Sequence, residues 1–136
     1  MQPSILIIDD DQDILEALRI ILEGESYKVR VALDGQQGLK AIEEEKPDLI
    51  ILDLLLPGKD GVSVCGSLKT RPEYRNIPVI VLTALTKKMG DKIFTQREEK
   101  VLREVDGYLD KPVNPQELLI KVRELLEREK DEKTRG

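Results

Sequence analysis

The sequence predicts an α/β domain with a five-stranded parallel sheet that has helices on both faces. Two observations lead to this fold class. Short apolar runs alternate five times with segments whose apolar residues recur at helical spacing. Several of the runs are uninterrupted, as in Leu49-Ile50-Ile51-Leu52, which is typical of strands buried on both sides. At 136 residues the chain is long enough for one such domain with its own core.

The first two strand–helix units have clear ends. We expect a strand over residues 4–9, followed by a helix from Gln12 whose apolar stripe stops at Gly24. Residues 27–32 alternate as in a half-buried strand. Asp34-Gly35 then turns the chain into a second helix that includes Leu39 and Ile42.

The later units are marked by glycine, proline and capping residues. A loop at Pro57, Gly58 and Gly61 follows the third strand and precedes a helix, where Cys65 is expected to be a small buried hydrophobe. Strands are expected at 79–83 and 107–109, separated by a long charged, mostly helical stretch over residues 87–104. Asn114-Pro115-Gln116-Glu117 predicts the start of the last helix. We expect a domain over residues 1–126 and a frayed, charged tail or linker remnant over 127–136.

Composition excludes several classes of function. The net charge of −5 argues against nucleic acid or an anionic membrane as a direct partner, since no basic excess is present. One cysteine permits no internal disulfide, and no apolar run is long enough to cross a bilayer, so we expect a cytoplasmic protein. The chain has no histidine, which excludes histidine bases, histidine-activated nucleophiles and histidine metal ligands within it.

Five alternating units fit the flavodoxin-like doubly wound sheet with strand order 2-1-3-4-5. In this topology, sites form at the carboxyl ends of the strands, where chemically distinctive residues gather in this sequence. Asp9 and Asp10 end the first strand, Asp53 the third, Thr83 the fourth and Lys111 the fifth. Four strands therefore deliver three carboxylates, one hydroxyl and one ammonium to one edge of the sheet.

This set suits a magnesium-dependent phosphoryl transfer. Asp9, Asp10 and Asp53 could hold Mg²⁺, whose hard charge prefers oxygen ligands, although aspartates after a strand can also serve only as helix caps. Lys111 can pair with a carboxylate or a phosphoryl oxygen, and Thr83 can donate a hydrogen bond to one. An aspartate can also act as the nucleophile that forms an acyl phosphate.

The motifs that carry these residues resemble the receiver domain of bacterial two-component response regulators. The likeness runs from about Ile5 to Leu126 and rests on five ordered segments: Ile7-Ile8-Asp9-Asp10, Pro47-Asp48-Leu49-Ile50-Ile51-Leu52-Asp53, Leu56-Pro57-Gly58-Lys59-Asp60-Gly61, Pro78-Val79-Ile80-Val81-Leu82-Thr83-Ala84 and Gly107-Tyr108-Leu109-Asp110-Lys111-Pro112.

The resemblance assigns a role to each residue of the site. It implies that Asp53 is the phosphoacceptor, and that Asp9, Asp10 and the main-chain carbonyl of Leu55 complete the Mg²⁺ site with it. Thr83 would be the switch hydroxyl, Lys111 its ionic partner and Tyr108 an aromatic residue that swings inward on activation. Lys111-Pro112 would be a cis peptide bond.

The resemblance also implies partners. A sensor histidine kinase or a histidine phosphotransfer protein would supply the phosphohistidine, while the output partner is not identified and a homodimer is possible. Such a chain is no conventional enzyme, although it catalyses its own phosphorylation and dephosphorylation at Asp53.

One region departs from the family pattern. Thr83 and Lys111 are 28 positions apart, several more than usual, and Glu104-Val105-Asp106 replaces the familiar Gly-Ala pair. We therefore expect an extended fourth-helix region over residues 85–105, as one longer helix or as two helices with a break.

Two other functions stay open on the sequence alone. A haloacid-dehalogenase-like phosphatase also uses a strand-end aspartate, Mg²⁺ and a lysine, and Asp9-x-Asp11 superficially resembles its first motif. A receiver-like module that is never phosphorylated and serves only for docking is the other alternative.

Overall fold

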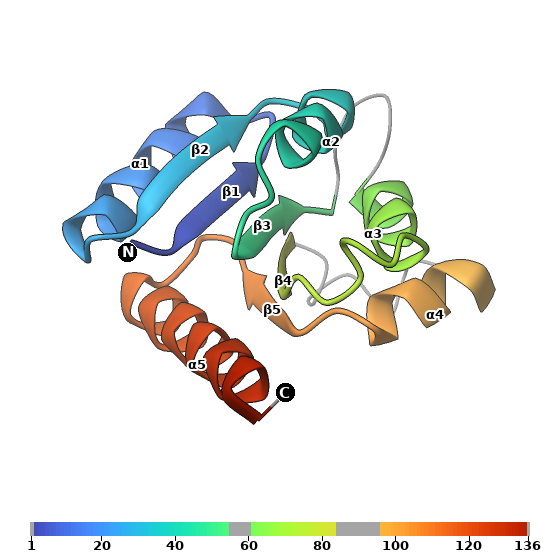
Figure 1. Ribbon diagram of the computed structural model, residues 1–136. Coiled ribbons are helices and arrows are strands. Elements are labelled where there is room, and N and C mark those ends of the chain that lie inside the picture. Colours follow the sequence, from blue (N-terminus) through green and yellow to red (C-terminus); the bar gives the residue numbers. More distant parts are fainter. Residues whose placement is uncertain (1, 55–60, 84–95, 136) are drawn as a thin grey trace.

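The computed structural model describes residues 2–54, 61–83 and 96–135, which form a five-stranded sheet in the order β2-β1-β3-β4-β5 (Figure 1). All four strand pairings are parallel. The predicted fold class and strand order are therefore confirmed. The strands are β1 (Ser4–Ile8), β2 (Lys28–Ala32), β3 (Leu49–Asp53), β4 (Val79–Thr83) and β5 (Gly107–Asp110).

Helices cover both faces of this sheet. They are α1 (Gln12–Gly24), α2 (Gly35–Glu44), α3 (Gly61–Lys69), α4 (Gln96–Arg103) and α5 (Pro115–Arg135). Figure 1 shows α1 and α5 on one side and α2 and α3 on the other. Within the described part of the chain, no helix is both long and apolar enough to cross a membrane.

The core has two halves, one on each face of the sheet. Successive strand residues point to opposite faces, so Leu6 and Ile8 pack with α2 and α3 while Ile5 and Ile7 pack with α1 and α5. Every residue of β1, β3 and β4 is buried. This two-sided burial is the physical reason for the uninterrupted apolar runs in the sequence. Cys65 is fully buried in the α2–α3 half, as expected.

Polar side chains start the helices where the sequence indicated. Asp11 caps α1 by accepting hydrogen bonds from the main-chain N–H groups of Asp13 and Ile14 at 2.9 and 3.3 Å. Asp34 caps α2, and Asn114 accepts two main-chain N–H groups at the start of α5. These caps fix the point at which the chain leaves the strand ends and enters each helix.

The structure changes some expected boundaries. The first strand ends at Ile8, the second begins at Lys28, and the last helix continues to Arg135 rather than fraying after Leu126. Residues 127–135 contain good helix formers such as Glu, Arg and Lys and neither Gly nor Pro, so intrinsic propensity favours a continued helix. The division into a domain and a tail stays a prediction.

Two expectations fall partly outside the described residues. The structure does not describe the loop residues Pro57 and Gly58, nor residues 85–95 of the extended region before α4. The described portion of the extended region forms α4, which lies next to α3.

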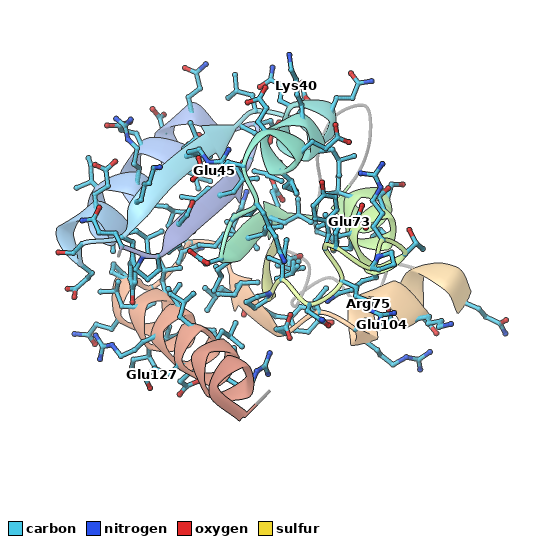
Figure 2. All side chains as sticks on the ribbon, in the orientation of Figure 1. Lys40, Glu45, Glu73, Arg75, Glu104 and Glu127 are labelled. Carbon is cyan, nitrogen blue, oxygen red and sulfur yellow. The ribbon has the colours of Figure 1, made fainter. Side chains whose placement is uncertain are left out.

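Charged side chains of both signs project from most elements (Figure 2). Glu45 follows α2, Glu73 and Arg75 lie between α3 and β4, and Glu127 lies on α5; all four are exposed.

Candidate functional site

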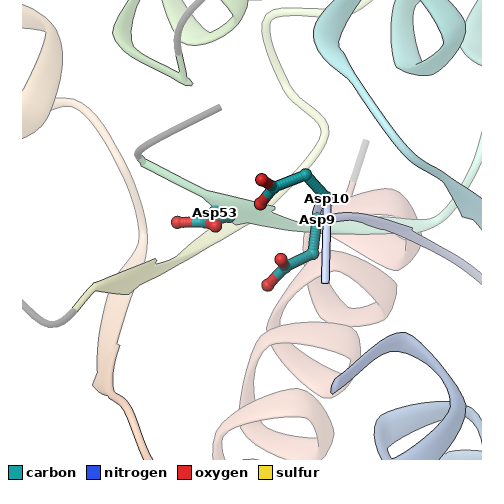
Figure 3. Close-up of side chains that lie close together, drawn as sticks. All are labelled: Asp9, Asp10 and Asp53. Carbon is teal, nitrogen blue, oxygen red and sulfur yellow. The ribbon is translucent and has the colours of Figure 1, made fainter. Parts of the chain in front are cut away.

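Three carboxylates meet at the carboxyl ends of β1 and β3 (Figure 3). Asp9 and Asp10 follow β1, and Asp53 is the last residue of β3. The two strands are neighbours, paired from Ile5↔Leu49 to Ile8↔Leu52, so their ends coincide. One oxygen atom from each aspartate lies within 4.8 Å of the other two. Asp9 is fully buried, Asp53 nearly so, and Asp10 is exposed.

Lys111 lies between two of these acids. Its Nζ atom is 3.0 Å from Asp9 Oδ2 and 3.0 Å from Asp53 Oδ2. The main-chain N–H of Lys111 donates to the Thr83 carbonyl at 3.1 Å, which holds the residue against the end of β4. The Lys111-Pro112 peptide bond is cis, as expected. The ammonium therefore reaches the acids from a fixed main-chain position.

The charges of the site act on one another. Burial raises the pKa of Asp9; hydrogen bonds from the Asp11 N–H and Lys111 oppose this rise, and the charge of Asp53 adds to it. Burial alone would lower the pKa of Lys111, but its hydrogen bonds and charge contacts with Asp9 and Asp53 outweigh burial and raise it. Lys111 is therefore a stable cation at neutral pH, whereas Asp9 is a weaker acid than usual.

The donor set fits a divalent metal ion. One ammonium faces three carboxylates, which leaves an excess of negative charge at a largely buried edge. Asp9 Oδ2 is buried and, apart from its ion pair with Lys111, has no hydrogen-bond partner among the described residues. Clustered carboxylate oxygens of this kind are the ligands that Mg²⁺ prefers.

Thr83 and Tyr108 lie on the adjacent strands β4 and β5, two positions apart in the register. Thr83 ends β4, is almost fully buried and lies one residue beyond Leu82, the register partner of Asp53. Tyr108 is paired with Val81, and 40% of the residue is exposed. Burial, more than the charge of Cys65, raises the pKa of Tyr108. Leu55, the expected carbonyl ligand, lies outside the described residues.

A main-chain hydrogen bond that the residue types did not indicate orients one of the three acids. The N–H of Asp11 donates to Asp9 Oδ1 at 2.9 Å, so the residue that caps α1 also orients the buried carboxylate. The Asp-Asp-Asp run contains this turn, but three adjacent acids do not reveal which one turns inward. Burial in the structure distinguishes Asp9 from its two exposed neighbours, Asp10 and Asp11.

Comparison with known proteins identifies the family to which this fold and site belong. A family model described as the response regulator receiver domain matches residues 5–123. The chain is 38% identical over 132 residues to the DNA-binding response regulator MtrA of Mycobacterium tuberculosis, covering 97% of this chain and 54% of the relative. It is 43% identical over 126 residues to the DNA-binding dual master transcriptional regulator RpaA of Synechocystis sp., covering 93% and 50%. The chain thus spans about half the length of these curated relatives.

Solved structures share the architecture over nearly their full length. A CheY-like response regulator receiver domain protein from Methanospirillum hungatei has a TM-score of 0.80 at 32% identity, covering 97% of this chain and 99% of that one. The crystal structure of a putative response regulator from Chloroflexus aurantiacus also has a TM-score of 0.80, at 33% identity, covering 93% of this chain and 98% of that one.

Proposed function

Because this chain belongs to the response regulator receiver domain family, we propose that it is a signalling switch activated by phosphorylation of Asp53. The observation that carries the proposal is the environment of this one side chain. Asp53 ends a central strand, is only 5% exposed, lies 3.0 Å from the Lys111 ammonium and shares an acidic cluster with Asp9 and Asp10. A nucleophile, a fixed cation and a metal-binding set therefore occur together.

The phosphoryl donor is a phosphohistidine on a sensor histidine kinase or a histidine phosphotransfer protein. The donor has to be in the partner, since this chain contains no histidine. A carboxylate oxygen of Asp53 attacks phosphorus, the P–N bond breaks with its electron pair going to the imidazole, and an acyl phosphate forms on Asp53. The released imidazole takes a proton from solvent.

The residues of the site contribute by position and charge. Asp9, Asp10, Asp53 and the predicted Leu55 carbonyl would hold Mg²⁺, which would supply positive charge against the spread negative charge of phosphoryl transfer. Asp9 is oriented by the Asp11 N–H, so the acid does not have to reorganise to act as a ligand. Lys111 is held at the same edge and offers its Nζ to the transferred oxygens.

The transferred group then changes the conformational equilibrium. A phosphoryl group adds about two negative charges next to Lys111 and Thr83, which can bind its oxygens. Differential binding of this kind shifts a pre-existing equilibrium, and a change from mostly off to mostly on requires about 5.5 kcal/mol. Tyr108, half exposed in this structure, moves inward in the active state.

The proposal also covers the cellular location, the output partner and the oligomeric state of the protein. We propose a cytoplasmic protein that acts on a protein output partner, with a homodimer as one possible form. Its net charge of −5 favours no direct contact of these residues with nucleic acid or membrane. The DNA-binding relatives are about twice as long, so their DNA binding is not extended to this chain.

The test is Mg²⁺-dependent modification by acetyl phosphate, measured as intact mass. The wild-type protein should gain one phosphoryl group, which EDTA prevents and Asp53→Asn abolishes. Asp13→Asn, a substitution of an exposed acid at the start of α1, is the matched control and should be modified normally. Modification of Asp53→Asn at the wild-type rate, or none of the wild type, would contradict the proposal.

A further inference from the structure

The first residue of α3 lies against the end of the strand that carries Asp53. The N–H of Gly61 donates to the Leu54 carbonyl at 3.1 Å. A Cβ atom built on Gly61 would be 2.5 Å from the Asp53 carbonyl oxygen, 2.6 Å from Leu54 Cα and 2.8 Å from the Leu54 carbonyl oxygen. Ordinary contacts of a Cβ atom begin at about 3.4 Å. Only glycine fits this position without a shift of the neighbouring atoms.

The atoms that a side chain would meet belong to the main chain. A side chain could rotate away, but the Asp53 and Leu54 backbone moves only with the strand end itself. That strand end is fixed on its other side, where the N–H of Leu54 donates to the Leu82 carbonyl at 3.1 Å. Any displacement at Asp53 therefore changes the position of its carboxylate relative to Lys111 Nζ, now 3.0 Å away.

We propose that Gly61 is a positioning residue for the phosphoacceptor. The close approach of α3 to β3 sets where the Asp53 carboxylate lies relative to Lys111 and the other two acids. The inference rests on the proposed function of Asp53, and it assigns to Gly61 a role that its place in a predicted loop did not indicate. Reactions that depend on orientation lose rate steeply when a reacting group is displaced by a fraction of its contact distance.

The test is Gly61→Ala, compared with the same substitution at two other glycines. Gly38→Ala also introduces a clash at a buried glycine, but with the side chain of Ile8, whereas a Cβ at Gly24 meets nothing within 4 Å. Each variant is measured by urea unfolding, by calorimetric titration of the unphosphorylated protein with Mg²⁺ and by the rate of phosphorylation from acetyl phosphate. The rate is expressed per folded molecule.

We expect Gly61→Ala to weaken Mg²⁺ binding and to slow phosphorylation by about tenfold or more. Gly38→Ala should lose stability while keeping the wild-type Mg²⁺ affinity and rate per folded molecule. Gly24→Ala should also keep both, and it should be at least as stable as the wild type because alanine is the better helix former at this last position of α1. Wild-type Mg²⁺ affinity and phosphorylation rate in Gly61→Ala would overturn the inference. Equal losses of affinity and rate in Gly38→Ala, at the same loss of stability, would also overturn it. Neither result would affect the proposed function, which is tested separately by phosphorylation of the wild-type protein and of Asp53→Asn.

If Gly61→Ala is unfolded in buffer, the measurements are repeated in trimethylamine N-oxide, which favours the folded state. If the variant stays unfolded there, hydrogen exchange of the wild-type Gly61 amide is measured with and without beryllofluoride and Mg²⁺. Coupling between the site and this contact is reciprocal, so the amide should exchange more slowly in the loaded protein. An unchanged exchange rate would overturn the inference.

Discussion

Replacing Lys111 by methionine should expose how the acidic cluster is stabilised. The Lys111 ammonium is 3.0 Å from an oxygen of Asp9 and from one of Asp53, and at an effective dielectric constant of 20 each contact is worth about 5.5 kcal/mol. Carboxylate oxygens no more than 4.8 Å apart repel by about 3.5 kcal/mol or more per pair on the same scale. The two attractions are thus similar in size to the three repulsions, and the cluster depends on the lysine.

Methionine keeps most of the length of the side chain but removes its charge. We expect Lys111→Met to lower the free energy of unfolding by about 3 kcal/mol without metal, at the lower end for a broken buried pair. The loss is smaller than the Coulomb figures because Asp9, whose pKa burial already raises, can take up a proton. Mg²⁺ should restore part of the stability, by about 2.7 kcal/mol at a concentration one hundred times its Kd.

The assay is urea unfolding at pH 7, followed by circular dichroism in EDTA and in Mg²⁺. Lys28→Met is the matched control: its pair with Glu45 is 3.5 Å long and half exposed, so its loss should be below about 1 kcal/mol. If Lys111→Met in EDTA is as stable as the wild type, or if Mg²⁺ stabilises neither protein, the electrostatic account of the site is wrong.

Three further predictions concern the same structure. The pKa of Asp9 is raised in the folded protein, so its contribution to stability is present below the usual pKa of 3.8 and is lost as pH rises through the folded-state pKa. Because Mg²⁺ needs the ionised acid, its affinity should fall as pH is lowered, starting above pH 3.8. A Mg²⁺ affinity that calorimetry finds constant down to pH 3.8 would contradict this prediction. Asp106→Ala should lower the free energy of unfolding by about 1–3 kcal/mol because the Val79 N–H, 2.8 Å from Asp106 Oδ2, loses its acceptor. Arg128→Ala removes only a partly exposed ion pair with Asp106 and should cost below about 1 kcal/mol, so equal losses in urea unfolding would contradict this prediction. Asp11→Ala should remove a helix cap at a cost of about 1 kcal/mol without changing Mg²⁺ affinity, since the main-chain N–H that orients Asp9 remains; a weakened affinity would assign the Asp11 side chain to the site.

The fold and the convergence of the acids could be predicted because both depend on local patterns with a direct physical cause. Burial on both faces requires continuous apolar strands, as in β1, β3 and β4, and a parallel sheet brings their carboxyl ends to one edge. Once the five strands were recognised, Asp9, Asp53 and Lys111 had to lie near one another. Their close contacts follow from the strand order 2-1-3-4-5, which the alternating pattern fits and the structure shows.

Features that depend on distance between separate elements could not be predicted. A glycine in a loop and a glycine packed against a strand look alike in the sequence, so only the three-dimensional structure shows that Gly61 lies against the end of β3. The sequence around Tyr108 does not predict whether this residue is buried or exposed, and in the structure it is 40% exposed. The helix beyond Leu126 has no apolar stripe, so its continuation to Arg135 rests on intrinsic propensity alone, which is a weak signal.

The central claim is that Asp53 itself carries the phosphoryl group, and borohydride reduction tests it most directly. The protein is incubated with acetyl phosphate and Mg²⁺, the acyl phosphate is reduced to homoserine, and the peptides are mapped by mass spectrometry. The account predicts homoserine at position 53, with Asp9 and Asp10 unmodified, and none when EDTA replaces Mg²⁺. Homoserine at position 9, as a phosphatase that uses this aspartate as its nucleophile would give, or none at any position, would contradict it.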